Sequence, residues 1–476
     1  MNSGKILKNT YYSPFKSRCL SNVNNNLLNQ SYNLHYFLLS SDNPCNNNEI
    51  HLIEYNDESL NIENVNIFTH QGEISNMVCL GMHEKENDGK HILVCSSGLY
   101  YSNDNNCSGN DIQNVCSLWL GDLNNFREND QNEANELEDV KKIENEIKNE
   151  RIEEHCSDKL DDNSFPYDHI QENIDNKSTE VQTNSENIIN SNKKCIPDLN
   201  KKGKLEKLCE LKRDEEYVGI KNIAWNDYEN EFQKIAIIDK YSYTIFDRNN
   251  SNNINFITSN FVNEQLNYGT FDPHHENVLA VVSDIHIYGY DIKSNKPIFS
   301  TYTNHKANIT SLDFNSNIPN ILMTSSKDGY IKMWDLRYLK NDFFTMNIHT
   351  HWITSININH FHDELLFTTS TDNTVKLHKL EYTNNLNIKD KQVNYRLIKT
   401  YSDHEESVYK GAWSKTDAWI LLNTISYSFS TNLRLCPKSD EICGKNDNFS
   451  IKNTLSGVHI IFVSNFMDVL RDTYNN

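Results

Sequence analysis

The sequence predicts an all-β protein, a seven-bladed WD40 β-propeller with a long, mostly disordered acidic insertion. Three observations support this fold class. Short runs rich in β-branched and aromatic residues recur with turn residues between them, which is typical of a sandwich, a barrel or a propeller. Three stretches in the second half repeat one another, and such self-similarity favours the propeller. Much of the negative charge is confined to one segment that has no strand pattern.

That charged segment is the predicted insertion, residues 127–203. Within it, residues 127–200 hold 20 acidic and 9 basic side chains, a net charge of -11 out of the -21 of the 476-residue chain. A segment with so much charge and so few apolar side chains buries too little surface to fold, so we expect disorder. The propeller is then expected over residues 11–126 and 204–435, and residues 436–476 form a tail without an assignment.

The clearest repeat starts at His305 and runs through T-S-S-K-D-G-Y-I-K-M-W-D-L-R. Further copies start at His351 and His404, close to the period of about 40–45 residues of a WD40 blade once loops are added. The Trp334-Asp335 dipeptide ends the third strand of the first copy, where this repeat carries its signature. The strands expected in these copies are Ile309–Phe314, Ile321–Ser325, Tyr330–Trp334, Ile353–Asn359, Leu365–Ser370, Thr374–Leu380, Ser407–Trp413 and Trp419–Ile425.

The earlier blades are more diverged but show the same kind of strand. With them the count reaches about seven blades, within the range of known propellers. The acidic insertion falls between the last two strands of the second blade. The strands expected here are Glu49–Tyr55, Ile74–Cys79, Ile92–Ser96, Val115–Leu120, Ile220–Trp225, Lys234–Ile238, Tyr243–Phe246, Tyr268–Phe271, Val278–Val282, His286–Asp291 and Pro297–Tyr302.

The polar residues of the repeat are expected to hold each blade together. A buried Asp–His hydrogen bond, extended through a strand hydroxyl of Ser325 or Ser326 to the Trp N–H, would satisfy every group and specify one packing. The second copy has His378 where the Trp would be, which predicts a weaker network. We therefore assign six residues to structural networks and not to catalysis: His305, Asp328, Trp334, His351, Asp372 and His404.

Composition excludes several classes of function. The net charge and a pI near 5.3 argue against binding nucleic acid or an anionic membrane. The eleven cysteines contain no C-x-x-C pair, and no secretory signal or membrane span is visible, so we expect a soluble protein in the reducing cytosol. No nucleotide-binding or hydrolase motif occurs, and we predict neither an enzyme nor a cofactor.

A metal site near the second repeat is also excluded. The pairs His349/His351 and His360/His362 flank one strand, and a strand of about eight residues spans about 26 Å, so the two pairs cannot share an ion. An adjacent Arg-Arg pair, as used by phosphoinositide-binding propellers, does not occur.

Beyond these features, the sequence resembles the family of WD-repeat proteins that interact with the EARP and GARP tethering complexes. The runs H-Q-G-E-I and H-E-E-S-V-Y, at opposite ends of the chain, are more telling than any single WD motif. The matching stretches occur in family order and are Asn48–Ser59, His70–Ile74, Phe271–His275, Ser325–Arg337, His349–Ile356, His362–Asp372, Asp403–Tyr409 and Trp413–Trp419.

The resemblance implies a seven-bladed propeller that acts as a non-enzymatic adaptor. Its partners would be subunits of EARP- and GARP-type tethering complexes, and its role endosome-to-Golgi retrograde transport and endocytic recycling. The implied location is cytoplasmic and peripheral at the trans-Golgi network and endosomes, as a monomer without membrane insertion. The family offers no catalytic residue to transfer.

The last blade departs from the family after Ser426-Tyr427, where its third strand should follow. Three explanations remain open. Asn432–Cys436 replaces the strand, Val458–Val463 replaces it, or the last exon is misread in the gene model; the first and third are favoured. The N-terminal run Tyr11–Cys19 resembles the opening strand of the family and could close the ring.

Four residues are candidates for contact with partners. Trp352 and Trp419 lie near loops, where aromatic side chains dominate binding energies, although packing between blades is the commoner role for such residues. Asp335 and Arg337 belong to a W-D-x-R box, by which some propellers dock the adaptor of a cullin-RING ubiquitin ligase. A substrate receptor of such a ligase is therefore the alternative function.

Overall fold

The structure is a computed structural model that describes residues 9–24, 33–43, 47–59, 61–85, 89–101, 112–123, 202–213, 219–226, 233–248, 254–382, 393–402, 404, 406–425 and 456–462. The chain divides into two compact units, residues 1–123 with 196–476 and residues 124–195. The second unit, and with it almost all of the predicted insertion, lies outside the described residues. No described segment forms a helix of the length and hydropathy needed to span a bilayer.

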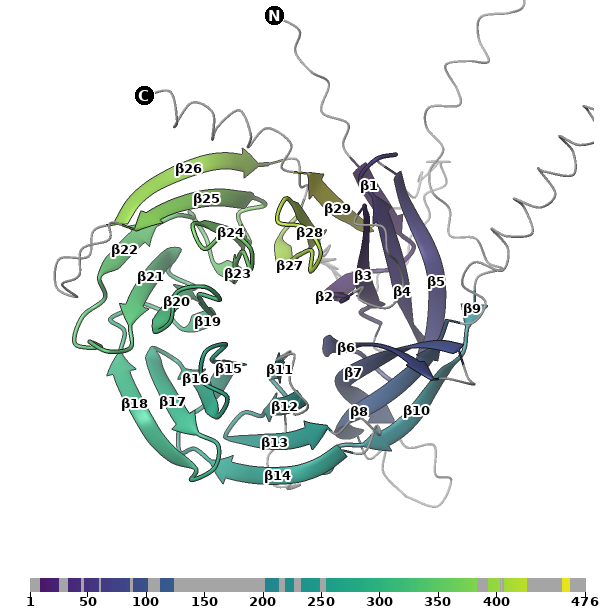
Figure 1. Ribbon diagram of the computed structural model, residues 1–476, viewed down its shortest axis with the longest axis horizontal. Coiled ribbons are helices and arrows are strands. Elements are labelled where there is room, and N and C mark those ends of the chain that lie inside the picture. The colour runs from purple at the N-terminus through teal and green to yellow at the C-terminus, as the bar shows by residue number, and fades with distance from the viewer. Residues whose placement is uncertain are drawn as a thin grey trace, which may run out of the picture. The chain divides into compact units, whose positions relative to one another are not determined.

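The first unit is an all-β propeller, as the repeats predict. Its described strands form seven sheets set around a central axis, each with its innermost strand at the axis (Figure 1). Six sheets, here blades 1–6, take their four main strands in chain order from the axis to the rim. The seventh, here the closing sheet, combines strands from both ends of the chain.

Blades 1–3 come from the diverged first half. Blade 1 contains β2 (Ser17–Asn22), β3 (Leu34–Ser41), β4 (Asn47–Asn56), β5 (Asn61–Gln71) and the short parallel strand β9 (Lys202–Gly203). Blade 2 contains β6 (Asn76–Lys85), β7 (Gly89–Tyr101), β8 (Ile112–Asp122) and β10 (Leu205–Glu210). Blade 3 contains β11 (Asn222–Asn226), β12 (Gln233–Ile238), β13 (Ser242–Arg248) and β14 (Ile254–Phe261).

Blades 4–6 contain the recognisable repeats. Blade 4 contains β15 (Leu266–Phe271), β16 (Val278–Ser283), β17 (His286–Asp291) and β18 (Lys296–Tyr302). Blade 5 contains β19 (Ile309–Phe314), β20 (Ile321–Ser326), β21 (Tyr330–Asp335) and β22 (Phe344–Asn347). Blade 6 contains β23 (Ile353–Ile358), β24 (Leu365–Ser370), β25 (Val375–Tyr382) and β26 (Val393–Tyr401).

The strands flanking the insertion are neighbours in blade 2, because β8 and β10 pair as antiparallel strands. Lys202 and Gly203, predicted to end the insertion, instead pair with Ile67 and Phe68 of β5. The outer strands β14, β22 and β26 were not predicted. Their side chains are half-buried or exposed, so they lack the apolar signal of the inner strands.

The closing sheet corrects the prediction for the last blade. Its order is β1 (Asn9–Ser13), β29 (Ser456–Phe462), β28 (Ile420–Ile425) and β27 (Val408–Trp413). The third strand is thus β29, which overlaps the run Val458–Val463 that was not favoured, while Asn432–Cys436 lies outside the described residues. The N-terminal run Tyr11–Cys19 does supply the closing strand, through β1, but the run is not one strand, because its second part belongs to β2 of blade 1. Pro14 lies between β1, the rim strand of the closing sheet, and β2, the axis strand of blade 1.

The core lies between neighbouring sheets and not within any one of them. The second strands are mostly buried, and β3, β20 and β24 are buried along their whole length, because both faces are covered by adjacent blades. One apolar cluster joins β24 to the closing sheet through Phe367, Trp413 and Leu421. Another joins the closing sheet to blade 1 through Ile420, Leu422 and Phe37. The ring is therefore held by contacts between successive sheets.

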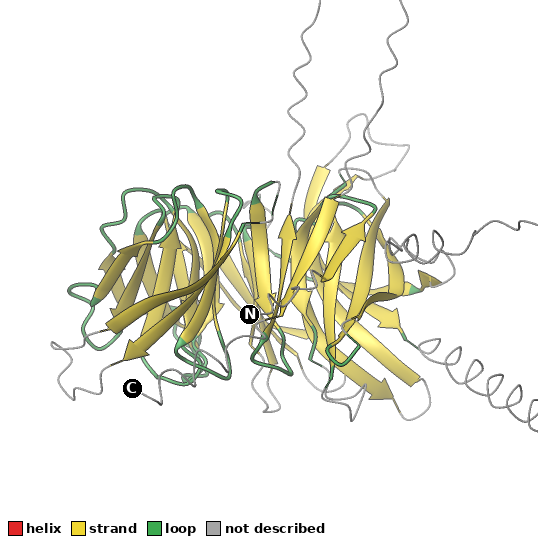
Figure 2. Ribbon diagram, turned by 90° about the horizontal axis from the view of Figure 1, so that it is seen from above, coloured by secondary structure: helices red, strands yellow, loops and turns green. Residues whose placement is uncertain are grey.

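A central channel of about 630 Å³ lies on the axis. Its lining includes residues from the innermost strand of every sheet, from Leu20 of β2 to Trp413 of β27. The strands run between two loop-bearing ends of the ring, visible from the side in Figure 2. The turn face carries the β20–β21 and β24–β25 turns and the loops that lead into β19 and β23. The opposite face carries the loops that follow β19, β21 and β23.

Candidate protein interaction surface

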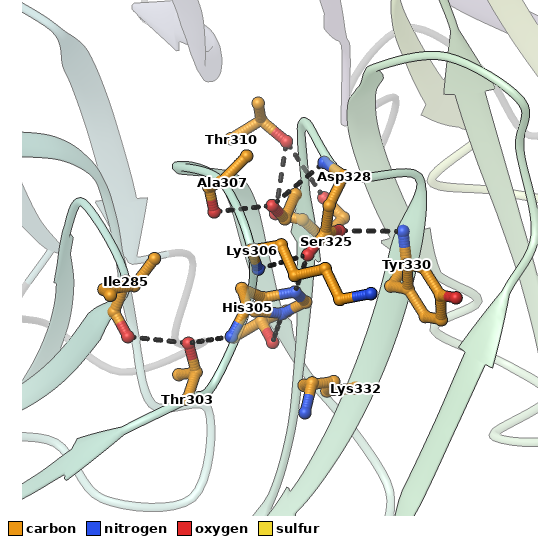
Figure 3. A network of polar contacts seen from close by, with 12 residues as sticks. Ile285, Thr303, His305, Lys306, Ala307, Thr310, Ser325, Asp328, Tyr330 and Lys332 are labelled. Carbon is orange, nitrogen blue, oxygen red and sulfur yellow. Dashed lines mark hydrogen bonds and ion pairs between the residues drawn. The ribbon is translucent and has the colours of Figure 1, made fainter.

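The predicted network of blade 5 forms, with one change of residue. His305 Nδ1 lies 3.1 Å from Asp328 Oδ2 in the β20–β21 turn, and the Asp328 carboxylate also accepts the Lys306 and Tyr330 N–H groups (Figure 3). The hydroxyl that links His305 to Trp334 belongs to Thr324, 3.0 Å from His305 Nε2 and 3.1 Å from Trp334 Nε1. The assignment to Ser325 or Ser326 was wrong.

Strand geometry explains why Thr324 takes this place. Side chains alternate between the two faces of a strand, so Ser325 points away from His305 and instead donates to the carbonyl of Ser311. Ser326 is on the correct face, but it lies closer to the turn and donates to the carbonyl of Ala307. Only Thr324 lies opposite both His305 and Trp334.

Blade 6 contains the same network, built on a different histidine. His349 Nδ1 lies 2.9 Å from Asp372 Oδ2, and His349 Nε2 lies 2.7 Å from Thr368 Oγ1. The assignment of His351 to this network was wrong. Spacing could have shown it, because the Asp lies 23 and the Thr 19 residues after His349, the same intervals as from His305.

His378 replaces the Trp of blade 6 without loss of hydrogen bonds. Its Nε2 lies 2.9 Å from Thr368 Oγ1, and its Nδ1 lies 3.1 Å from the Tyr395 hydroxyl of β26. One assignment of protons satisfies every hydrogen bond in this network. The Tyr395 hydroxyl donates to His378 and His378 donates to Thr368; the Thr368 hydroxyl then donates to His349, and His349 donates to Asp372. The sequence predicted a weaker network at His378, but each ring nitrogen of His378 has a hydrogen-bond partner.

Electrostatics favours this arrangement of charge. Burial lowers the pKa values of His349 and His378, so both imidazoles are neutral at pH 7. Burial opposes ionisation of Asp328, but hydrogen bonds from His305, Tyr330 and Lys306 outweigh it and lower the pKa of Asp328 to about 2. The pKa of Asp372 is lowered in the same way by His349 and Thr374. Both turns therefore hold an ionised carboxylate, and in blade 6 this carboxylate faces a neutral His–Thr unit.

Blade 2 holds a third network that sequence reasoning missed. His70 Nε2 and Trp119 Nε1 both lie 2.9 Å from Ser96 Oγ. His70 Nδ1 lies 3.3 Å from the Gly72 carbonyl, which takes the place of the Asp. The strands β6, β7 and β8 have 10, 13 and 11 residues, against six in each corresponding strand of blade 5, and this changes the spacing and hides the repeat. His404, assigned to the last repeat, is buried at the loop that leads into β27.

The corrected assignment predicts unequal effects of two neighbouring substitutions. His349→Ala should lower the free energy of unfolding by about 2–3 kcal/mol, because Asp372 and Thr368 lose a buried partner. His351→Ala should change it by no more than about 0.5 kcal/mol, because His351 is exposed. Chemical denaturation of both variants measures this, and equal losses would contradict the assignment.

Of the four candidate contact residues, Trp352 alone presents a large apolar surface. It precedes β23 on the turn face and is 48% exposed. His351 stacks on its ring, with centroids 5.3 Å apart and planes at 21°, and Lys327 Nζ lies 4.8 Å from the ring centroid. We call Lys327, His351 and Trp352 the Trp352 patch. It spans blades 5 and 6.

The Trp352 patch is held in place by the scaffold beneath it. The carbonyl of Trp352 accepts the N–H of Thr371 at 3.0 Å and its hydroxyl at 3.3 Å, and the same hydroxyl contacts His351 Nδ1. Lys327 is in the turn that Asp328 and His305 fix. An exposed aromatic that is already ordered loses little conformational entropy on binding, which suits a protein interface.

The other three candidates are placed differently. Trp419 is half-buried, contacts His362 at 4.8 Å between ring centroids, and packs against the cluster between blade 6 and the closing sheet. Asp335 is buried, so it cannot itself contact a partner. Its carboxylate accepts Arg337 Nε at 2.9 Å and Nη2 at 2.7 Å. Arg337 is 49% exposed and lies on the opposite face from Trp352.

A family model described as EIPR1 beta-propeller matches residues 176–378. The resemblance is confirmed over this stretch. Of the described strands, those from β9 to the middle of β25 fall within it. So do the Trp352 patch, the network of blade 5 and that of blade 6 apart from Tyr395. The match to the EIPR1 family and the propeller geometry together establish a WD-repeat type of scaffold.

Proposed function

We propose that this protein is a non-enzymatic adaptor that binds subunits of EARP- and GARP-type tethering complexes. In this role it would serve endosome-to-Golgi retrograde transport and endocytic recycling from a cytoplasmic position at the trans-Golgi network and endosomes. The EIPR1 family match supports the class of partner. The observation that supports a binding site on the turn face is the Trp352 patch, which presents an ordered and exposed aromatic side chain there.

The side chains of the Trp352 patch indicate what kind of segment a partner would place there. Trp352 offers a flat apolar surface, and Lys327 places a positive charge against the edge of the site. A second exposed lysine, Lys306, lies next to the same turn, 5.9 Å from the ring centroid of Tyr330. A segment with an apolar or aromatic side chain followed by carboxylates would be recognised by this arrangement.

Trp352→Ala should weaken capture of tethering-complex subunits about 30-fold or more, the effect of truncating an interface hot spot. The matched control is Phe361→Ala. Phe361 is also 48% exposed, but it lies beyond the other end of β23 on the opposite face. The measurement is affinity purification of the full-length variants from their own cells, with partner subunits quantified by mass spectrometry.

The outcomes separate the possibilities. If Phe361→Ala removes the partner and Trp352→Ala does not, the opposite face binds and the Trp352 patch is excluded. If neither the wild-type protein nor the variants recover a tethering subunit, the proposed adaptor role fails and the propeller scaffold stands alone.

The alternative of a cullin-ligase receptor rests on Arg337 alone, since Asp335 is buried beneath it. Arg337→Ala in the same purification tests it directly. Loss of a cullin-ligase adaptor from this variant, with tethering subunits retained, would establish a separate docking site on the opposite face.

A further inference from the structure

Three potential metal ligands meet where blade 1 packs against the closing sheet. His35 comes from β3, Asp57 follows β4, and Asp417 lies in the loop before β28. One ligand atom of each residue lies within 4.8 Å of those of the other two. His35 Nε2 and Asp57 Oδ2 are 3.9 Å apart. These three residues belong neither to the blade networks nor to the Trp352 patch.

The imidazole of His35 is fully buried, and hydrogen bonds at its Nδ1 fix the orientation of the ring. Its Nδ1 lies 2.7 Å from Thr416 Oγ1 and 3.0 Å from Ser414 Oγ, while its Nε2 makes no hydrogen bond. The hydroxyls of Thr416 and Ser414 can accept a proton on Nδ1, and this tautomer leaves Nε2 able to bind an ion. The Nε2 lone pair therefore faces the two carboxylates.

Two carboxyl groups lie beside the Nε2 side of His35. Asp417 is oriented by the N–H of Trp419, which donates to its Oδ1 at 2.7 Å. Asp57 Oδ1 is buried and makes no hydrogen bond. The imidazole nitrogen and the two carboxyl groups together offer three ligand atoms to one cation.

We propose that His35, Asp57 and Asp417 bind a divalent transition metal, with Zn²⁺ as the fitting ion. One imidazole nitrogen with two carboxylates is a borderline donor set that suits zinc better than magnesium or calcium, which prefer oxygen ligands alone. Zn²⁺ binds nitrogen and carboxylate oxygen at about 2.0–2.2 Å, so the ligands need to close by only a fraction of their present spacing. The hydroxyls of Thr416 and Ser414 fix the histidine, as outer partners do in zinc sites.

The ion would act as a clamp at the closure of the ring. It would connect β3 of blade 1 to the loop before β28 of the closing sheet. A ligand that binds only the folded state stabilises it by mass action. Zinc should therefore raise the midpoint of thermal unfolding of the full chain, independently of any protein partner.

The test compares zinc binding by isothermal titration calorimetry in metal-free full-length protein and four variants. Asp417→Asn and Asp57→Asn should each weaken Zn²⁺ binding at this site about 100-fold or more, and Thr416→Val, which alters only the support of His35, about 10-fold. The matched control is His275→Gln, which removes an exposed histidine that pairs with Asp272 at 2.9 Å but has no third ligand. It should bind zinc as the wild type does.

Cobalt(II) in place of zinc distinguishes this site from the cysteines. Binding should give a spectrum without thiolate charge transfer, and Asp417→Asn should abolish it. Three results would overturn the proposal: no zinc binding by the wild type, equal binding by the wild type and Asp417→Asn, or a thiolate–cobalt band that accounts for all the bound metal. Circular dichroism of the variants confirms that loss of binding is not loss of folding.

Discussion

Thr324→Val should lower the free energy of unfolding by about 2–5 kcal/mol, because the methyl group keeps the volume but deletes the hydroxyl shared by His305 and Trp334. Both partners are buried, so His305 Nε2 and the Trp334 N–H would each be left without a hydrogen bond. Stranding a buried polar group costs more than the bond itself contributes. Denaturant titration of the purified variant measures the loss.

Thr345→Val is the control for this substitution. Thr345 lies on β22 of the same blade with an exposed side chain, and the same chemical change there should stay within about 0.5 kcal/mol. Ser325→Ala tests the sequence-based assignment. If Ser325→Ala destabilises as much as Thr324→Val, the network does not depend on Thr324 and the structural assignment fails.

Asp313→Asn should stabilise the protein above pH 7. Asp313 lines the central channel and accepts the N–H of Ile358 at 2.8 Å, which an Asn carbonyl can also do. Its side chain is half-buried in the wall of the channel. Burial raises its pKa from 3.8 to about 7, despite the opposing hydrogen bonds.

The direction of the pH dependence follows from the pKa of Asp313, which is lower in the unfolded state than in the folded state. Below about pH 4 Asp313 is protonated in both the folded and the unfolded state, so it does not lower the free energy of unfolding. As pH rises towards 7 the unfolded state ionises first and is favoured, so stability is lost across this interval. The full shift corresponds to about 4 kcal/mol, and water in the channel reduces the expected gain of the variant to roughly 2–4 kcal/mol.

The measurement is the difference in unfolding free energy between Asp313→Asn and wild type from pH 4 to pH 8. Taking the difference cancels the contribution of other groups that titrate in this range. Glu276→Gln, at an exposed carboxylate, should follow the wild type throughout. A difference that does not grow with pH would show that channel water, and not burial, sets the ionisation of Asp313.

Together these substitutions separate the scaffold from the binding surface. Thr324 and His349 hold blades, and their loss should lower stability. Trp352 contributes an exposed ring, and its loss should lower binding with little effect on stability. This division is expected of a propeller, where function resides in side chains placed on rigid loops.

The repeats could be predicted from the sequence because their signals are local. A strand of blade 5 contains its own β-branched residues, and the Asp328-Gly329 turn is visible as a dipeptide, with Gly329 at a φ of 81°. An added Cβ there would lie 2.4 Å from the His349 carbonyl oxygen, which explains the glycine. The strands β14, β22 and β26 lacked such signals because rim strands bury less apolar surface.

The sequence by itself determined the all-β repeat architecture, the His305–Asp328–Trp334 set and the exposed candidate Trp352, since periodicity and turn chemistry act over a few residues. Only the tertiary structure decided three further points. It chose Thr324 over its serine neighbours and His349 over His351, because the alternation of strand faces and the register of pairing select one hydroxyl and one imidazole. It placed β29 beside β28, and it brought His35 and Asp57 to Asp417, because closing a ring joins segments that no local pattern connects.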